Sequence, residues 1–407
     1  MKKFRRILLI AANALCVLGV LICAFSFVSL RKTQTSQRAA ERWRGESETR
    51  FAQVSVFTPT DAALSESGVE TFRKTIDGKL AEAGVLQPET GSLWRDAFCT
   101  VGAVSAATDY GSCKAQAFGV GGDFFLFHPL RLLSGQYLAQ DDLMNDRVVV
   151  NEMLAWKLYG GTDLAGMTVT VNGETCVIVG VVRTEDDFAA KQALDKDAML
   201  IFMDYSRLSP EGEAAADITA YELVMPNPLT GYARQFAQNG LGGGTGVLTV
   251  ENSARFTIDE LWKSLRTFGQ RVMRTTPVVL PYWENAALYA ETALSGILLL
   301  TALLCILPAL TCLWLLVRGW KLLKAAAKTG ARRAGEAIED RKEKRWEKRE
   351  AQKRAERAQK TKPKPEPAPE KTPEPQPEKA AESAAPEEDD MQDVNRLVRE
   401  ILEEKSK

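Results

Sequence analysis

Two long apolar runs constrain the fold of this chain more than any other feature. The first, Ile7–Val28, contains about 22 apolar or small residues and follows four basic residues near the N-terminus. A run of this length can cross a bilayer as a helix. The alternative is a cleaved signal peptide, for which Ala24-Phe25-Ser26 would be an acceptable cleavage site. Because the run is long for a signal peptide and a second run exists, we favour an uncleaved membrane anchor.

The second run, Ala286–Val317, has about thirty residues and a single carboxylate, Glu291. Aromatic side chains near both ends resemble the interfacial belts of transmembrane helices: Tyr282, Trp283 and Tyr289 at the outer end, Trp314 and Trp320 at the inner end. Pro308 removes a backbone donor inside the run and is expected to kink the helix. We place Glu291 at the level of the outer headgroups; a functional intramembrane charge is the alternative.

Charge is distributed unevenly along the chain, although 52 basic and 53 acidic residues nearly balance overall. Ser29–Ala286 carries 24 basic and 32 acidic residues, whereas Arg318–Lys362 carries 17 basic and 7 acidic residues. Cytoplasmic flanks of transmembrane helices are enriched in Lys and Arg. The pattern therefore predicts a multi-pass protein of the cell (plasma or inner) membrane with both termini in the cytoplasm and Ser29–Ala286 outside.

The segment between the runs has an α+β pattern, which is clearest in its middle. Arg147–Val150 is a β-branched run that predicts a strand. Asn151 follows at the N-cap position of a short, largely apolar helix that reaches Tyr159. Gly160-Gly161 is typical of a helix end, because glycine tolerates positive φ. Asn172-Gly173 then predicts a tight hairpin between Met167–Val171 and Thr175–Val182.

Further elements are expected on both sides of this middle part. Strands are predicted at Phe51–Phe57, on either side of Asp109–Ser112, and at Ala198–Met203, Tyr221–Met225 and Val247–Val250. Helices are predicted at Leu64–Ala83, Asn227–Gln238 and Thr257–Arg274. The first of these helices places Val69, Phe72, Ile76 and Leu80 on one face. Arg31–Arg50 is polar and compatible with a helix, so it is expected to extend the first apolar helix outward as a stalk.

These residues resemble a known family. Phe124-Phe125 with Leu133–Gln136, Val148–Glu152, and Thr175–Val182 resemble, in order and spacing, segments of the MacB-type periplasmic core domain. That domain is the extracytoplasmic module of FtsX/MacB-like ABC transporter permeases. The clear resemblance covers about sixty residues, from Asp123 to Val182. The alternative is an ordinary α+β domain of no particular family.

The sequence offers little for catalysis. We find no Ser/His/Asp or Cys/His set, and the glycine-rich segment Gly240–Gly246 lacks the Gly-Lys-Ser/Thr of a phosphate-binding loop. The single histidine, His128, precedes a proline and is interpreted as structural. Four cysteines lie in the apolar runs, while Cys99, Cys113 and Cys176 lie outside them and would permit one disulfide that nothing indicates. We expect no metal site, no cofactor and no enzymatic activity.

The C-terminal part is predicted to be cytoplasmic. Residues 318–360 favour a basic helix that attracts anionic headgroups; nucleic-acid binding is the weaker alternative, because Trp346 is the one aromatic residue after Trp320. Residues 361–389 are rich in Pro, Glu and Lys and predict a disordered linker. The C-terminal helix then has an apolar stripe that consists of Met391, Val394, Leu397, Val398, Ile401 and Leu402. This stripe predicts docking to a cytoplasmic partner, and the alternative is a solvated helix without a partner.

The fold class is therefore α+β, with a membrane-anchored extracytoplasmic domain between two transmembrane helices, followed by a charged helix and a disordered tail. The predicted order is a cytoplasmic N-terminus (1–6), a first transmembrane helix (7–28), an extracytoplasmic MacB-like core domain (29–285), a second transmembrane helix (286–317), a basic juxtamembrane helix (318–360), a disordered linker (361–389) and an amphipathic C-terminal helix (390–405).

The resemblance implies a role in an ABC export or mechanotransmission complex. The family's permeases have four membrane helices and work with an ATPase, so the expected partners are an ABC ATPase subunit, possibly a full FtsX-like permease, and an extracytoplasmic protein. This sequence has a charged helix and tail where the family has its third and fourth membrane helices, which puts autonomous permease activity in doubt. The alternative is a membrane-anchored scaffold that links an extracytoplasmic protein to a cytoplasmic one without an ATPase.

Overall fold

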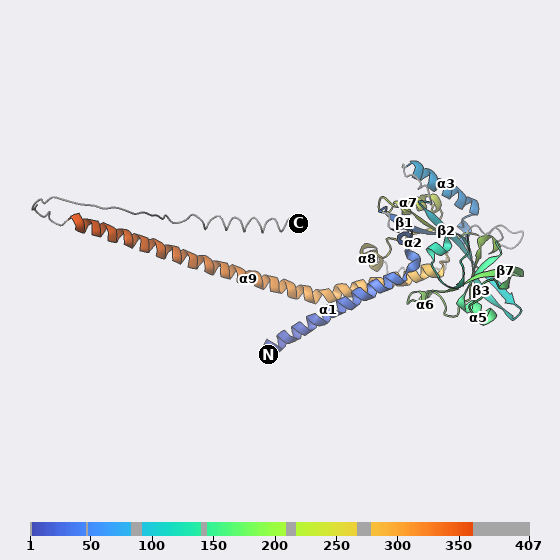
Figure 1. Cartoon of the computed structure of the whole chain (residues 1–407), viewed down its shortest axis with the longest axis horizontal. Coiled ribbons are helices and arrows are strands. Elements are labelled where there is room, and N and C mark those ends of the chain that lie inside the picture. Colours follow the sequence, from blue (N-terminus) through green and yellow to red (C-terminus); the bar gives the residue numbers. More distant parts are fainter. Residues whose placement is uncertain are drawn as a thin grey trace, which may run out of the picture. The chain divides into compact units, whose positions relative to one another are not determined.

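The computed structural model describes residues 2–45, 48–82, 92–139, 145–208, 217–266 and 278–360. The chain divides into two compact units, residues 1–320 and 321–407. The first unit contains helix α1, the beginning of helix α9, and between them a sheet domain that comprises the ten described strands and helices α2 to α8 (Figure 1). Of the second unit, the described part is the continuation of α9.

All ten described strands belong to one hydrogen-bonded sheet. They are β1 (Phe51–Phe57), β2 (Arg95–Thr108), β3 (Gly111–Gly122), β4 (Arg131–Gly135), β5 (Arg147–Asn151), β6 (Thr168–Val171), β7 (Glu174–Arg183), β8 (Leu200–Asp204), β9 (Ala220–Pro226) and β10 (Leu248–Glu251). Their order is β10-β1-β9-β2-β3-β8-β5-β7-β4, and β6 pairs with both β2 and β7. The double pairing of β6 divides the sheet into two halves, and β4 is an additional strand that pairs with β7.

One half is a closed barrel, formed by β2, β3, β8, β5, β7 and β6. The ring closes where β6 pairs with β2, with Val171 opposite Ala106. Alternate residues of these strands point inward and bury an apolar core, which helix α5 (Glu152–Tyr159) covers with Leu154 and Leu158. Its strand residues include Val104, Ala117, Val148, Val150, Val169, Ile178 and Ile201. Closure leaves no free strand edge inside this ring, so hydrogen bonding and burial are satisfied within the barrel.

The other half, the open sheet, consists of β10, β1, β9 and the beginning of β2. Helices α3 (Glu66–Glu82) and α7 (Tyr232–Leu241) pack on one face of it. Helix α3 buries the predicted stripe of Val69, Phe72, Ile76 and Leu80 against this face. The facing strand residues are Ala52, Val54 and Val56 of β1 and Tyr221, Leu223 and Met225 of β9. This face is therefore an ordinary helix-on-sheet core.

The second face of the open sheet is also covered. Helices α2 (Ala39–Arg44) and α4 (Phe124–Phe127) lie against it, together with the first residues of α9. The remaining helices and helical turns are η1 (Thr35–Gln37), η2 (Thr60–Ala62), α6 (Ala190–Ala193), η3 (Tyr205–Leu208) and α8 (Ile258–Arg266). Because both faces are covered, the polar residues of β1 and β9 that alternate with apolar ones are buried rather than exposed to water.

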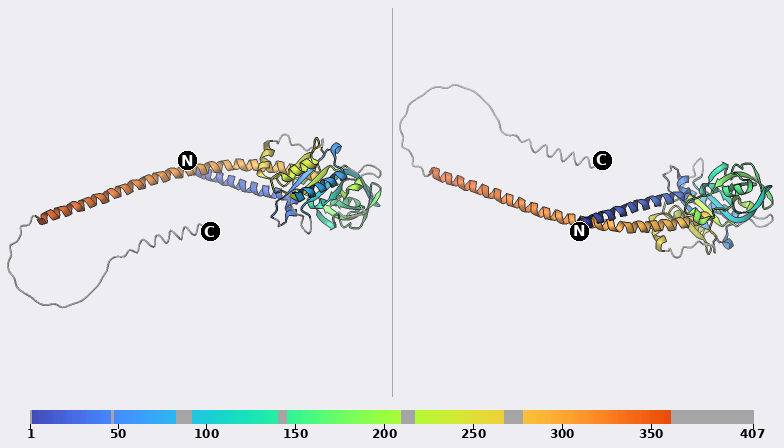
Figure 2. Two further views of the ribbon diagram at one scale, coloured as in Figure 1. Left: turned by 90° about the horizontal axis from the view of Figure 1, so that it is seen from above. Right: turned by 90° about the horizontal axis from the view of Figure 1, so that it is seen from below.

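Two helices of the described chain are long and apolar enough to cross a membrane, judged by length and composition. They are α1 (Lys2–Thr33) and α9 (Tyr282–Lys360). Both extend from the sheet domain in the same general direction (Figure 2), and they contact each other. Thr311 Oγ1 donates a hydrogen bond of 2.8 Å to Asn13 Oδ1 across this contact. A Cβ atom on Gly19 would lie 2.9 Å from Leu304 Cδ1, so the helices approach closely there. Pro308 lies inside α9, which continues without a break through the basic segment 318–360.

Several local predictions are confirmed. The side chain of Asn151 caps α5 by accepting a hydrogen bond of 3.0 Å from the backbone N–H of Leu154. Gly160 ends that helix at φ 73°. Asn172 and Gly173 adopt φ of 51° and 95° in the hairpin between β6 and β7, as a type I′ turn requires. Each of these features depends on neighbouring residues, which is why the sequence predicts it.

The predicted stalk over Arg31–Arg50 is wrong. Helix α1 ends at Thr33, and η1 and α2 pack against the open sheet instead of extending α1. Ala39 and Ala40 are small enough to lie flat on the sheet and are buried in its core. The segment therefore becomes part of the sheet domain.

The predicted outer aromatic belt is also wrong in part. Tyr282 and Trp283 are only 5% and 3% exposed and pack against Phe118 and Phe124 in the core of the sheet domain. The helix predicted over Asn227–Gln238 begins at Tyr232, because Pro228 and the positive φ of Gly231 disfavour an earlier start. The helix predicted over Thr257–Arg274 is described as α8, and its residues beyond 266 lie outside the described chain.

Candidate functional site

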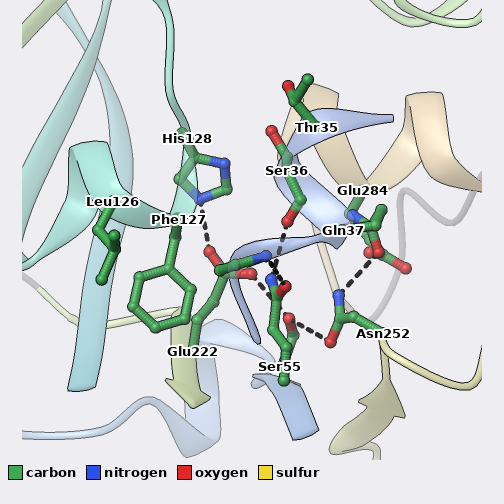
Figure 3. A network of polar contacts seen from close by, with 12 residues as sticks. Thr35, Ser36, Gln37, Ser55, Leu126, Phe127, His128, Glu222, Asn252 and Glu284 are labelled. Atoms are coloured by element: carbon green, nitrogen blue, oxygen red, sulfur yellow. Dashed lines mark hydrogen bonds and ion pairs between the residues drawn. The ribbon is translucent and has the colours of Figure 1, made fainter. Parts of the chain in front are cut away.

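A buried polar network joins the open sheet to the segment that follows α1 and to the first turns of α9, and we call it the junction network. Its eight residues come from six parts of the chain: Gln37, Ser55, His128, Glu222, Asn252, Arg255, Glu284 and Glu291. All eight are buried. Figure 3 shows most of them, with Ser55 and Glu222 between His128 on one side and Asn252 on the other.

The network starts on the polar face of β1. Gln53 and Ser55 point to the same face as Phe51 and Phe57 and are fully buried. The Gln53 amide accepts a hydrogen bond of 2.8 Å from the backbone N–H of Ala39 and donates one of 2.8 Å to the carbonyl of Ser36. Both partners belong to the segment that follows α1. One side chain of β1 thus satisfies the backbone at the beginning of α2 and fixes the chain after α1 to the sheet.

Ser55 connects the two sides of the network. Its Oγ lies 2.8 Å from Glu222 Oε1 and 2.9 Å from Asn252 Oδ1, and its single proton can be donated to one of them at a time. Glu222 lies opposite Ser55 in the antiparallel register of β9 and β1. Its second oxygen, Oε2, is 2.5 Å from His128 Nε2. The sheet register therefore positions the carboxyl group between a hydroxyl and an imidazole.

His128 links the network to the aromatic core. The imidazole packs between Phe124 and Trp283, with ring centroids 4.6 and 4.2 Å away. Trp283 belongs to the first turn of α9. Within the described chain, Nδ1 of His128 is buried without a hydrogen-bond partner. These contacts give His128 a packing and hydrogen-bonding role.

Arg255 joins the network to α9. Its guanidinium forms a two-pronged ion pair with Glu284, with N···O distances of 2.8 and 2.7 Å, and reaches Glu291 at 3.2 Å. Glu284 and Glu291 are seven residues apart and share one face of the helix. Burial alone would lower the pKa of Arg255, but the carboxyl groups of Glu284 and Glu291 more than offset this, and the pKa is raised. The guanidinium is therefore a permanent buried cation between two carboxyl groups.

The segment after α1 meets the same guanidinium. Gln37 Oε1 accepts hydrogen bonds from Asn252 Nδ2 at 2.8 Å and from Arg255 Nη1 at 3.2 Å. The backbone N–H of Asn252 is bonded to the carbonyl of Gln53 at 2.9 Å, which holds this turn on β1. As a result, the segment after α1, the first turns of α9 and two strands of the sheet are held by one connected set of hydrogen bonds.

The hydrogen bonds and ion pairs of the network hold segments that are distant in the sequence in fixed relative positions. Charge-assisted and two-pronged hydrogen bonds are strong and directional, so a buried network that contains them favours one geometry over others. Among the residues that the structure describes, no group of three or more His, Cys, Asp or Glu side chains could hold a metal ion. Cys99, Cys113 and Cys176 are free thiols, and burial raises the pKa of each.

A cleft of about 600 Å³ lies at a separate place, where the barrel meets α4 and η3. Its lining combines aromatic side chains such as Phe125 and Tyr137 with charged ones such as Arg73. Arg73 is already held by Asp96, with N···O distances of 2.7 and 3.0 Å. The cleft therefore has a mixed aromatic and charged lining.

The site predicted from the sequence differs from this network. Its residues lie outside the described chain: Met391, Val394, Leu397, Val398, Ile401 and Leu402. Of the network, the sequence drew attention to His128 and Glu291. Glu291 lies beside Arg255, a pairing that no alternation pattern could reveal. One usable signal existed, namely a second carboxylate, Glu284, seven residues earlier on the same helical face.

The comparison with protein families decides the relationship of this chain. The model of the MacB-like periplasmic core domain matches residues 14–221, about half of the chain. The chain belongs to this family. In this MacB-like protein the match runs from inside α1 to Tyr221, so it includes Ser55 and His128 and ends one residue before Glu222. The Arg255 ion pair and α9 lie beyond the matched segment.

Solved structures of similar domains are also known. The periplasmic region of MacB from Actinobacillus actinomycetemcomitans is 13% identical, and the alignment covers 55% of this chain and 94% of that one, with a TM-score of 0.36. The extracellular domain of the noncanonic ABC-type transporter YknZ from Gram-positive bacteria is also 13% identical. Here 49% of this chain and 99% of that one are covered, with a TM-score of 0.34. No curated protein matches this chain.

Proposed function

We propose that this MacB-like protein is a permease-like membrane subunit of an ABC export or mechanotransmission complex, in which a partner chain hydrolyses ATP. Membership of the family supports an ABC-transporter-type permease. The observation that carries the rest is the ion pair of Arg255 with Glu284 and Glu291, which ties the sheet domain to α9. A displacement of the two helices would be transmitted to the sheet domain through this ion pair, and this transmission would not require a substrate channel through the membrane.

The proposed topology has α1 and α9 across the cell membrane, both termini in the cytoplasm and the sheet domain outside. A cysteine-free variant with single cysteines at Tyr110 or Trp346 tests it, because both side chains are exposed. A membrane-impermeant maleimide added to intact cells should label position 110 and leave position 346 unlabelled until the cells are lysed. Labelling of position 346 from outside would contradict this topology.

The proposed partners are an ABC ATPase, possibly with a full FtsX-like permease, and an extracytoplasmic protein bound by the sheet domain. The C-terminal residues 390–405 would bind a cytoplasmic partner through their apolar stripe. Burial of Leu397 and Ile401 would stabilise such a complex by roughly 1.5–3 kcal/mol each before ordering costs. Leu397→Asp combined with Ile401→Asp should release the cytoplasmic partner in pull-downs and leave membrane insertion unchanged. Identical pull-downs from the double variant would exclude docking by this stripe.

Transmission of motion can be measured directly. The full chain is purified from native membranes with its ATPase, and nitroxide labels are placed at Trp156 on the barrel and Leu303 on α9, both exposed. ATP with vanadate should change the distance between the labels in the wild type, and Arg255→Leu should reduce the change. Arg183→Leu is the matched control, since Arg183 forms a two-pronged pair with Glu152 on the barrel surface.

The alternative function is a membrane-anchored scaffold without an ATPase. One observation favours it: within the described chain, two helices qualify as membrane spans, and α9 continues as a charged helix to Lys360. A scaffold predicts that no ABC ATPase accompanies the chain from native membranes and that nucleotide leaves the label distance unchanged. Those two results together would favour the scaffold function over the permease-like function.

A further inference from the structure

The contacts between α1 and α9 define how the two helices are aligned. Asn13 meets Thr311, and Gly19 meets Leu304. The residue numbers of each pair add up to 324 and 323, as expected for two antiparallel helices with equal rise. Extended along the helices, this register places Val28 level with about residue 295. The first apolar run, Ile7–Val28, thus lies beside roughly residues 296–317, and the first ten residues of the run Ala286–Val317 extend beyond it.

Six of those ten residues are buried by protein, and the other four are partly buried. Ala286, Ala287, Ala290 and Leu294 are buried in a cluster with Phe256 and Leu261 of the sheet domain. Glu291 is held by Arg255, and Ser295 Oγ donates a hydrogen bond of 3.3 Å to the carbonyl of Leu261.

Exposed apolar side chains of α9 begin just after this point. Leu299, Leu300 and Leu303 are 43%, 49% and 56% exposed. The segment 296–317 has a length of about 33 Å at 1.5 Å per residue, which matches a hydrocarbon core of about 30 Å. The outer edge of the bilayer therefore falls near Val28 and Ser295.

Helix α8 lies at this edge. It packs through Leu261 on the part of α9 that contains Leu294 and Ser295. Its outward residues Ile258 and Trp262 are one helical turn apart and are 58% and 41% exposed. Exposed apolar residues are common on soluble surfaces, so exposure alone decides nothing. The informative feature is the position of these two residues at the bilayer edge, because tryptophan is enriched at the level of the lipid headgroups.

Phe188 is a second exposed residue at the same level, contributed by the loop before α6. It is 59% exposed and lines a shallow groove with Phe25 of α1 and Ile297 of α9. Both of these helix residues lie within a few positions of the bilayer edge given by the register. The preceding residue, Asp187, is held by Gln34 at 3.1 Å, so the loop is fastened to the segment after α1.

We propose that Ile258, Trp262 and Phe188 form a membrane-contacting collar, which inserts into the outer headgroup region of the bilayer. The collar rests on the two-span topology of the proposed function. Its occupant is the lipid surface, because each of the three side chains is tied through its neighbours to the part of α1 or α9 where protein cover ends. The collar sets the height of the sheet domain and keeps the buried Arg255 pairs just outside the hydrocarbon.

The test uses the full chain in nanodiscs of phosphatidylcholine and phosphatidylglycerol. Single nitroxide labels are placed at 188, 258 and 262 in a variant whose seven free cysteines are replaced by alanine. Accessibility to oxygen, which partitions into lipid, is compared with accessibility to a water-soluble nickel chelate. The matched controls are Glu260 on the polar side of α8 and Trp156, an exposed tryptophan of the barrel. Leu303 reports whether α9 itself lies in lipid.

The collar predicts that labels at 188, 258 and 262 favour oxygen over the nickel chelate by several-fold relative to 156 and 260. Equal ratios at 262 and 156, with 303 still in lipid, would overturn the collar and leave the two-span topology intact. A water-like ratio at 303 would overturn the topology and the collar together. Protection of 258 and 262 from both reagents would show that a second copy or another protein covers this face, and would also overturn the collar. Thermal melts of the labelled variants confirm that each is folded.

Discussion

The barrel and the junction network stabilise their parts of the molecule in different ways. The barrel buries an almost purely apolar core, in which Val148, Ile178 and Ile201 are typical members. Among the residues that the structure describes, six Asp, Glu, His or Arg side chains are buried, and five of them belong to the junction network: His128, Glu222, Arg255, Glu284 and Glu291. The sixth, Asp96, is paired with Arg73 of α3. An apolar core tolerates changes of shape, whereas a buried polar network is satisfied in one geometry only. The difference indicates that the junction network, rather than the barrel, fixes the positions of the two helices relative to the sheet.

The largest effect is expected from Arg255→Leu. The substitution leaves Glu284 and Glu291 buried without a cation, and breaking a buried ion pair from one side costs about 3–5 kcal/mol. Thermal unfolding of the detergent-solubilised full chain should show a markedly lower midpoint. Arg255→Met combined with Glu284→Gln and Glu291→Gln should recover part of the loss, because no charge stays unpaired. An unchanged midpoint for Arg255→Leu would show that the junction network does not depend on its buried ion pairs, contrary to the proposed difference from the barrel.

A smaller loss is expected from His128→Phe. Phenylalanine retains the packing between Phe124 and Trp283 but leaves Glu222 Oε2 without its partner. An unsatisfied buried group of this kind costs about 3 kcal/mol. Tyr137→Phe provides the comparison, because it removes one hydrogen bond to a neutral carbonyl and should cost about 1 kcal/mol. Equal losses in denaturant unfolding would show that Glu222 does not need the imidazole.

The thermal stability of the barrel should depend more on the turn between β6 and β7 than on its charged side chains. Gly173→Val places a β-branched residue at φ 95°, where no neighbouring atom lies within 4 Å of the added Cβ, so the cost is backbone strain of roughly 1–3 kcal/mol. Gly243→Val adds the same side chain in open space without a positive φ and should cost less. The thermal midpoints of the two variants separate strain from side-chain size. Equal midpoints would refute the turn assignment.

The smallest effect is expected at the barrel surface. The hydrogen bond from Arg183 lowers the pKa of Glu152, so the stabilisation is present above the ordinary Glu pKa of 4.5 and disappears as the pH falls through the lowered value. Arg183→Leu should therefore lower the melting temperature slightly at pH 7, and the difference from wild type should vanish in acid. A difference that persists at pH 2 would show that packing of the Arg183 side chain, rather than its charge, stabilises the barrel.

Local features of this protein follow from the sequence. Asn151 and Gly160 delimit α5, Asn172-Gly173 turns the chain between β6 and β7, and the spacing of Val69 to Leu80 gives the buried face of α3. The apolar runs give two helices of sufficient length to span a membrane. In each case residues within about four positions, or a regular period, carry the physical requirement.

The tertiary structure alone decided what covers each face. The alternation in β1 shows that Gln53 and Ser55 share a side, but a period of two is the same whether that side meets water or η1 and α2. Tyr282 and Trp283 satisfy the pattern of an interfacial belt, yet they pack on Phe118 and Phe124. Arg255 and Glu284 are 29 residues apart, and Ser55 and Glu222 are 167 residues apart. Such pairings depend on strand register and helix packing between distant segments, which local periodicity does not encode.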